Sequence, residues 1–236
     1  MSDLLHDRSN QLRHNLEAAH ERIRNASDGR VVELLVVSKT YPATDVKILS
    51  QLGQARFGEN RDQEAREKVL ECADFPLLKW HMIGQLQSNK FKSIARWADM
   101  VETLDRVDHI QALDKAASMA NRTLGVLIQF NLDPADSPSR GGAHVSEIPE
   151  FLQEFDRAPH LLLRGVIGIA PHPSTGMPAG GAFEKLALTS QMIRETHPGA
   201  EMISAGMSED LESAISAGAT QVRLGSAILG QRQYVQ

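Results

Sequence analysis

The sequence predicts a closed (β/α)8 barrel, a TIM barrel, with one extra helix at its N-terminus. Eight short apolar runs are each followed by an amphipathic helical stretch or a final turn, as in a series of βα units. Several runs are continuously apolar, which is typical of parallel strands covered by helices. The 236 residues suit one such barrel, so we expect residues 1–236 to form a single domain. An open, doubly wound sheet uses the same units and is the alternative.

An amphipathic helix precedes the first expected strand. Its apolar residues recur at helical spacings and fall on one face, and they are Leu5, Leu12, Leu16, Ala19 and Ile23. Charged residues fill the other face, and an Asp-Gly pair at positions 28 and 29 ends the helix.

The eight apolar runs are the expected strands. They are Glu33–Ser38, Ala55–Gly58, Leu78–Ile83, Met100–Thr103, Gly125–Asn131, Leu163–Ala170, Glu201–Ser204 and Gln221–Gly225. The expected helices between them are Ala43–Leu52, Arg61–Glu71, Ser88–Ala98, Arg106–Ala120, Val145–Phe155, Ala182–Glu195 and Glu209–Ala217, and a short turn follows Ser226. Active sites of such barrels form at the carboxyl ends of the strands, so residues at these ends are the functional candidates.

Composition and charge exclude several classes of protein. The 30 acidic and 25 basic residues give a formal net charge of −5, and no basic patch typical of nucleic-acid binding is visible. The single cysteine cannot form an internal disulfide. We find no apolar stretch long enough to span a membrane, no secretory signal, and no His or Cys spacing typical of a metal site. We therefore expect a cytoplasmic protein that binds neither nucleic acid nor membrane.

Lys39 ends the first expected strand, at the mouth of the barrel. Partial burial there disfavours the charged ammonium form and leaves the amine available for a Schiff base. A lysine that extends from the strand end into solvent is the alternative. The second strand ends in Glu59 and Asn60, where capping of the next helix by Asn60 is an equal alternative. His81 lies within the third strand, and we interpret it as a core histidine rather than a ligand.

The loops after the seventh and eighth strands predict a phosphate site. In barrels these loops and a helix N-terminus often bind phosphate through backbone N–H groups. Gly206 and Gly225 permit close approach of the backbone, and Ser208 and Ser226 add hydroxyl donors. An ordinary helix cap at Ser208 is the other interpretation. Arg223, at the end of the eighth strand, either faces the ligand or pairs with a neighbouring acid.

A lysine for a Schiff base, a phosphate site and an arginine between them fit one cofactor, pyridoxal 5′-phosphate (PLP). An arginine opposite the ring nitrogen, rather than an aspartate, disfavours a protonated pyridine and weakens the electron sink. Such an arrangement limits carbanion chemistry but does not prevent binding.

Five motifs give the sequence a resemblance to a known family. They are VSKT (Val37–Thr40), FGEN (Phe57–Asn60), HMIGQLQSNK (His81–Lys90), SAGMS (Ser204–Ser208) and VRLGS (Val222–Ser226). With these motifs in order along nearly the whole chain, the protein resembles the PLP homeostasis proteins. That family is also called YggS-like or proline synthase co-transcribed, and it is similar to the N-terminal barrel domain of alanine racemase.

The resemblance implies a PLP-binding barrel with Lys39 as the Schiff-base lysine. It implies that Asn60 lies beside the cofactor, that Arg223 lies near the ring nitrogen, and that the phosphate is surrounded by Met207, Ser208, Gly225 and Ser226. Ser204 opens the motif that contains two of these residues, and we count it with them. Members of the family are thought to hold PLP or hand it on in vitamin B6 balance, without established turnover. The expected partners are PLP, other B6 vitamers and, transiently, PLP-dependent apoenzymes.

Two enzymatic alternatives stay open. A PLP-dependent racemase needs a second proton carrier, which in alanine racemase is a tyrosine from a second domain that we expect this protein to lack. Only Tyr41 and Tyr234 are present, so we expect weak racemase activity at most, and without that domain we expect a monomer. A class I aldolase-like barrel would also use a lysine Schiff base, with Glu59 as the acid/base partner.

Two loops rich in Pro, Gly and Ser follow the fifth and sixth strands, at residues 133–144 and 171–181. They would lie over the predicted active face, and our hypothesis is that they act as lids that gate the release of PLP. Ordinary surface loops are the alternative.

Overall fold

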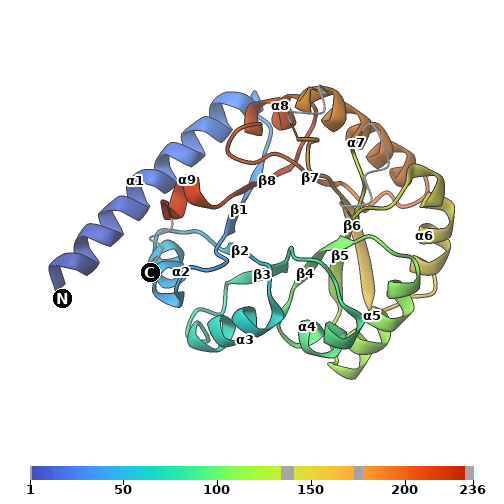
Figure 1. The fold of residues 1–236 in the computed structure, drawn as a ribbon, viewed down its shortest axis with the longest axis horizontal. Helices are drawn as coiled ribbons and strands as arrows, with labels where there is room; N and C mark the ends of the chain where they lie inside the picture. The colour runs from blue at the N-terminus through green and yellow to red at the C-terminus, as the bar shows by residue number, and fades with distance from the viewer. Residues whose placement is uncertain (1, 134–140, 173–177, 232–236) are drawn as a thin grey trace.

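A computed structural model of the chain shows a closed barrel of eight parallel strands surrounded by helices (Figure 1). It describes residues 2–133, 141–172 and 178–231. Neighbouring strands pair in chain order, and the last strand pairs in parallel with the first, with Glu33 opposite Gln221. The predicted (β/α)8 fold is therefore confirmed, and the open sheet is wrong.

The expected strands and helices are all present in the described part of the chain. The strands are β1 (Glu33–Val37), β2 (Arg56–Glu59), β3 (Lys79–Met82), β4 (Met100–Leu104), β5 (Leu124–Gln129), β6 (Leu161–Ile167), β7 (Met202–Ser204) and β8 (Gln221–Leu224). The α-helices are α1 (Ser2–Ser27), α2 (Ala43–Gln51), α3 (Asp62–Glu71), α4 (Phe91–Trp97), α5 (Asp108–Met119), α6 (Ile148–Phe155), α7 (Ala179–Arg194), α8 (Leu211–Ser216) and α9 (Ser226–Leu229). Two 3-10 turns, η1 (Ser88–Lys90) and η2 (Val145–Glu147), precede α4 and α6.

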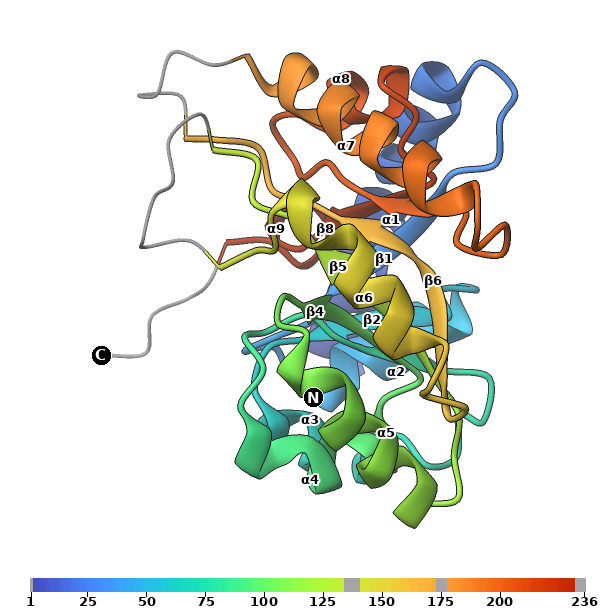
Figure 2. The same ribbon diagram turned by 90° about the vertical axis from the view of Figure 1, so that its right-hand side faces the viewer.

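The α-helices form the outer layer of the barrel. In the view turned by 90°, α5, α6 and α7 lie along the outside of β6 (Figure 2). The main core lies between these helices and the strands, and it includes the fully buried side chains of Phe57, Phe91, Phe151 and Phe183. None of the helices in the described residues is both long enough and apolar enough to cross a membrane.

The first helix covers the seam where β1 meets β8 (Figure 1). Leu12, Leu16, Ala19 and Ile23 are buried, as the spacing predicts. Polar side chains on α1 also hold the chain after β7 and β8. Asn15 Nδ2 donates to the carbonyl of Ile228 at 2.9 Å. The extra helix therefore fixes α9, which begins directly after β8.

The main differences from the expected elements are at strand and helix ends near the barrel mouth. β6 ends at Ile167 rather than Ala170, and the next carbonyl, that of Gly168, accepts a hydrogen bond from Arg223 Nη2 at 2.9 Å. α8 begins at Leu211 rather than Glu209, because a turn precedes it in which the Asp210 carboxylate accepts the Met207 N–H at 2.6 Å.

Gly165 lets β6 and β7 approach each other closely. Its φ is +147°, and a Cβ placed on it would lie 1.9 Å from the carbonyl oxygen of Met202. Any side chain here must push the two strands apart or break their pairing.

Replacing Gly165 with alanine should therefore lower the free energy of unfolding by about 3 kcal/mol or more, measured by urea denaturation. Gly180 in α7 is the matched control, since a Cβ there meets nothing within 4 Å. Gly180→Ala should be neutral or stabilise the protein by up to about 1 kcal/mol. Equal stability of Gly165→Ala and the wild type would contradict the close approach.

Candidate functional site

A cavity of about 660 Å³ opens at the carboxyl ends of the strands. Seven of the eight predicted site residues line it, and these are Lys39, Asn60, Met207, Ser208, Arg223, Gly225 and Ser226. Ser204, the eighth, is buried beneath the cavity and bonds to Arg223. The structure therefore brings together residues from both ends of the chain.

Lys39 lies two residues beyond the end of β1, and its half-buried side chain lies in the cavity wall with Val37. Alternation along the strand turns Ser38 the other way, where its hydroxyl donates to Glu59 Oε1 at 2.6 Å. Thr40 has a left-handed backbone, with φ of +69°, so the chain turns sharply immediately after the lysine. The barrel therefore presents the lysine toward the cavity.

A buried arginine forms part of the cavity floor. The Arg223 guanidinium donates from Nη1 to Ser204 Oγ at 2.8 Å and from Nη2 to the carbonyl of Gly168 at 2.9 Å. Burial lowers the pKa of Arg223, and the negative charge of Glu102 opposes that effect. Because a guanidinium stays protonated in proteins, its charge must be balanced from within the barrel.

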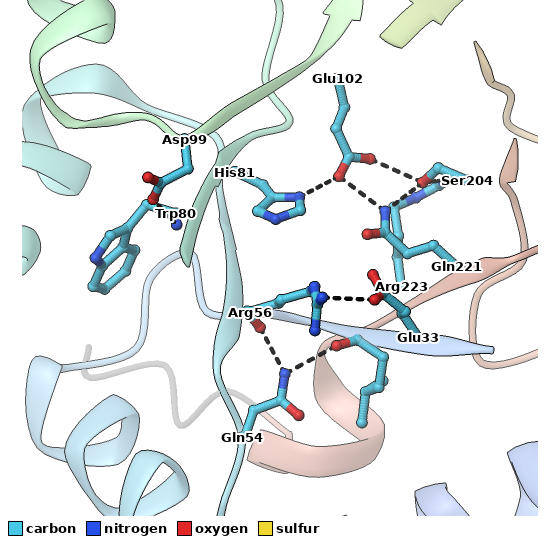
Figure 3. Close-up of polar contacts among 11 residues, drawn as sticks. Glu33, Gln54, Arg56, Trp80, His81, Asp99, Glu102, Ser204, Gln221 and Arg223 are labelled. Carbon is cyan, nitrogen blue, oxygen red and sulfur yellow. Dashed lines mark hydrogen bonds and ion pairs between the residues drawn. The ribbon is translucent and has the colours of Figure 1, made fainter. Parts of the chain in front are cut away.

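Glu102 on β4 supplies this balance (Figure 3). Its Oε2 accepts the Ser204 hydroxyl at 2.8 Å, and its Oε1 accepts Gln221 Nε2 at 2.9 Å and lies 2.5 Å from His81 Nδ1. Burial alone would raise the pKa of Glu102, but the hydrogen bond and charge of His81, with Arg223 and Gln221, hold it below its ordinary value. His81 is thus a core histidine, as predicted.

These five side chains form one connected polar network inside the barrel, the interior network of His81, Glu102, Ser204, Gln221 and Arg223. It joins β3, β4, β7 and β8 and keeps the guanidinium in a single orientation. Figure 3 also shows contacts outside this network. They are an ion pair of 2.6 Å between Arg56 and Glu33, hydrogen bonds from Gln54 to backbone carbonyls, and one from the Trp80 N–H to Asp99.

The residues at the end of β2 divide between the cavity and the outer layer. Asn60 lines the cavity and does not cap α3, whose N-cap position is Arg61, so the capping alternative is wrong. Glu59 is fully buried on the other side of the strand, with Ser38 and Lys68 as its partners. Burial raises the pKa of Glu59, and the charge of Lys68 opposes that effect. Glu59 is therefore not positioned as an acid/base partner of Lys39 in an aldolase.

The loops after β7 and β8 form one side of the mouth. Gly206 has a left-handed φ of +92°, which turns the chain toward Ser208. A Cβ on Gly225 would lie 3.3 Å from the carbonyl oxygen of Val37, so β8 passes close to the strand that carries Lys39. Ser208 is not a helix cap, because α8 begins only at Leu211.

The opposite wall contains polar residues that the sequence analysis missed. Asp105 follows β4, and burial raises the pKa of its carboxyl group. Gln129 lies at the end of β5, and its Nε2 donates to the carbonyl of Gly141 at 3.0 Å. Asp105 and Gln129 could both have been predicted, because each is a polar residue at the end of a barrel strand. Within the described part of the chain, no group of three His, Cys, Asp or Glu side chains could hold a metal ion.

Comparisons with known proteins find relatives over nearly the whole chain. The family model for the alanine racemase N-terminal domain matches residues 8–233. A pyridoxal phosphate homeostasis protein from Mycobacterium leprae (strain TN) is 38% identical and covers 97% of this chain and 95% of its own. One from Escherichia coli (strain K12) is 35% identical, with coverage of 95% and 98%.

Solved structures match over the same length. PipY of Synechococcus elongatus PCC7942 with PLP bound has a TM-score of 0.81 and 28% identity, and the match covers 93% of this chain and 100% of that one. Alanine racemase from Clostridium difficile 630 shares the fold alone, with a TM-score of 0.70 and 13% identity over 96% of this chain and 58% of that one.

This eight-stranded barrel belongs to the class of the alanine racemase N-terminal domain, whose family model matches nearly the whole chain. Within that class, the chain belongs to the family of pyridoxal phosphate homeostasis proteins.

Replacing Glu102 with glutamine should lower the free energy of unfolding by about 3 kcal/mol at neutral pH, because it leaves the Arg223 charge uncompensated. A carboxylate with a lowered pKa stabilises the fold above its unfolded pKa, and this contribution is lost as the pH falls through the folded pKa. The difference between variant and wild type should therefore shrink in acid.

Urea denaturation at several pH values measures this difference. The control is Glu67→Gln on the exposed face of α3, which should change stability by less than about 0.5 kcal/mol. A constant difference between Glu102→Gln and wild type at every pH would argue against a charge-balancing role.

Proposed function

We propose that this protein binds PLP at the barrel mouth, holds it as a Schiff base on Lys39 and acts in intracellular vitamin B6 homeostasis. The observation that carries the proposal is a single cavity lined by Lys39, Arg223 and the two serines Ser208 and Ser226. These groups match the aldehyde, the ring nitrogen and the phosphate of PLP. The names of the curated relatives and the PLP-bound structure of PipY support it.

Lys39 supplies the covalent attachment in this proposal. Its neutral amine adds to the aldehyde carbon, a water molecule leaves, and a C=N bond replaces the C=O bond. The half-buried Lys39 side chain lines the cavity together with Val37 and Ile83. Asn60 contributes an amide on the same side of the cavity.

The phosphate would lie against the loops after β7 and β8. Ser208 and Ser226 offer hydroxyl donors, and Met207 and Gly225 border the same space. The first N–H groups of a helix have no partner within it, and α9 begins at Ser226. A dianionic phosphate is well matched to such donors.

Arg223 favours holding the cofactor over catalytic turnover. Bound PLP supplies an electron sink that is strong only when its ring nitrogen is protonated. A permanently charged guanidinium, fixed by Ser204 and Gly168, has no acceptor for that proton and disfavours it. Tyr41, which lines the cavity, donates its hydroxyl to the carbonyl of Gly230 at 2.5 Å and is thereby engaged, while Tyr234 lies outside the described residues. These contacts support a PLP carrier, with weak racemase activity as the second candidate.

Further parts of the proposal concern partners. We propose a cytoplasmic monomer that accepts PLP and related B6 vitamers and passes PLP to apoenzymes through transient contacts.

The proposed lid loops, 133–144 and 171–181, lie partly outside the described residues. The described end of the first loop is fixed to β5, since the Ala143 N–H donates to the carbonyl of Gln129 at 2.7 Å.

Replacing Lys39 with alanine should abolish the visible absorption band of the PLP-loaded protein. After borohydride reduction and digestion, the wild type should yield a pyridoxyl group on the Lys39 peptide and the variant none. Lys92→Ala, on the exposed face of α4, is the matched control and should behave as the wild type. A wild type that stays colourless in excess PLP, or an adduct on another lysine, would contradict the proposal.

Replacing Ser208 and Ser226 with alanine should weaken PLP binding by about tenfold for each lost hydrogen bond to the phosphate. Binding of pyridoxal, which has the aldehyde but no phosphate, should change by less than about twofold. Titration of absorbance measures both affinities. Equal losses for the two ligands would place the phosphate elsewhere.

A further inference from the structure

A second lysine, Lys68, is buried directly behind the strand end that carries Lys39. It lies on α3, its side chain is 5% exposed, and it does not line the cavity. Its Nζ lies 2.6 Å from Glu59 Oε1, 2.8 Å from the carbonyl oxygen of Ser38 and 3.1 Å from Glu64 Oε1. A buried ammonium with three oxygen partners is a built polar site rather than a solvated surface charge.

The contacts of Lys68 reach both peptide groups that flank Lys39. The Ser38 carbonyl belongs to the peptide before Lys39 and accepts directly from Lys68. The Thr40 N–H belongs to the peptide after Lys39, and it donates to Glu64 Oε1, the same oxygen that Lys68 contacts. Lys68 therefore holds the backbone before the proposed Schiff-base residue directly, and the backbone after it through Glu64.

The turn after Lys39 needs such a restraint. Thr40 is β-branched and has a left-handed backbone, a conformation that such residues disfavour. The Thr40 N–H bond to Glu64 holds that conformation, and Glu64 is itself held by Lys68 four residues later on the same face of α3. Fixing the two peptides fixes the direction in which the Lys39 side chain leaves the strand.

Glu59 completes the arrangement from β2. It accepts hydrogen bonds from Ser38 Oγ and Lys68 Nζ, both at 2.6 Å, so the β1 and β2 strand ends share the same cation. We call Lys68, Glu59 and Glu64 the clamp. Its members contact the backbone or the neighbours of Lys39, and none of them lines the cavity.

We propose that Lys68 is a positioning residue for Lys39, which acts by clamping the peptide groups before and after it so that its amine is directed toward the cofactor aldehyde. This inference rests on the proposed function, because it assigns Lys68 a role in the Schiff base at Lys39. We therefore expect that removing the clamp weakens the covalent capture of PLP by Lys39 and leaves binding of the phosphate and the ring unchanged.

The test compares two ligands that differ at the aldehyde. Pyridoxine 5′-phosphate has the ring and phosphate of PLP but carries an alcohol, so it cannot bond covalently to Lys39. In Lys68→Met, we expect the affinity for PLP and the rate of appearance of the absorption band each to fall at least tenfold. The affinity for pyridoxine 5′-phosphate, measured by calorimetry, should stay within twofold of the wild type.

A second variant covers the case in which Lys68→Met fails to fold. Without Lys68, Glu59 would keep a buried charge, and its Oε2 already has no hydrogen-bond partner among the described residues. The double variant Lys68→Met/Glu59→Gln removes both charges, and we expect the same selective loss of PLP binding. Lys90→Met, an exposed lysine before α4, is the matched control and should bind both ligands normally.

Two results would overturn the inference. A folded double variant that captures PLP with wild-type rate and affinity would show that the clamp does not position Lys39. Equal weakening of both ligands would show a general structural role. Failure of the proposed function is distinguishable, since the wild type itself would then form no borohydride-stable adduct at Lys39.

Discussion

The organisation of the barrel interior depends on one buried positive charge, the guanidinium of Arg223. Moving such a charge out of water is costly unless it is paired and hydrogen-bonded. Glu102 provides the counter-charge, and Ser204 lies between the two and contacts both. The need to balance the Arg223 charge therefore explains why the interior network occupies a region that many barrels fill with branched apolar residues.

The same constraint gives the site its geometry. Arg223 is held by Ser204 on β7 and by the carbonyl of Gly168, just beyond the end of β6, so its exposed edge can face only the cavity. Because β8 closes the barrel against β1, the loop after Arg223 lies beside Lys39 although 184 residues separate them in the sequence. Helix α1 packs over this seam and binds the carbonyls of α9 through Arg8 and Asn15. The lysine, the arginine and the serines are thus placed by closure of the barrel itself.

The clamp and the interior network act on opposite sides of the strands. In the proposed function, the interior network would set the chemistry that faces the ring of the cofactor, and the clamp would set the direction of the lysine from behind. Both rely on buried charge pairs, which contribute less to stability than apolar packing but hold a defined arrangement. The two sets share no residue, so their effects can be separated by mutation.

The fold could be predicted from the sequence because strand and helix periodicities recur in eight units. Lys39, Arg223, Ser208 and Ser226 could be predicted because the end of a barrel strand is itself a functional signal. Glu102 and Lys68 could not, because their roles depend on which face of an element they occupy and on partners far away in the sequence. The aldolase alternative, in which Glu59 is the acid/base partner, fails for the same reason: Glu59 is adjacent to Asn60 but faces the outer layer.

In the proposed complex, the ring nitrogen of bound PLP should lie against Arg223 and stay unprotonated. Nitrogen NMR of the protein loaded with PLP that carries ¹⁵N in the ring measures this state. We predict a pyridine-type resonance that does not change as the pH is lowered from 8 to 6. A pyridinium-type resonance at neutral pH would show that Arg223 does not face the ring nitrogen, and would contradict the account.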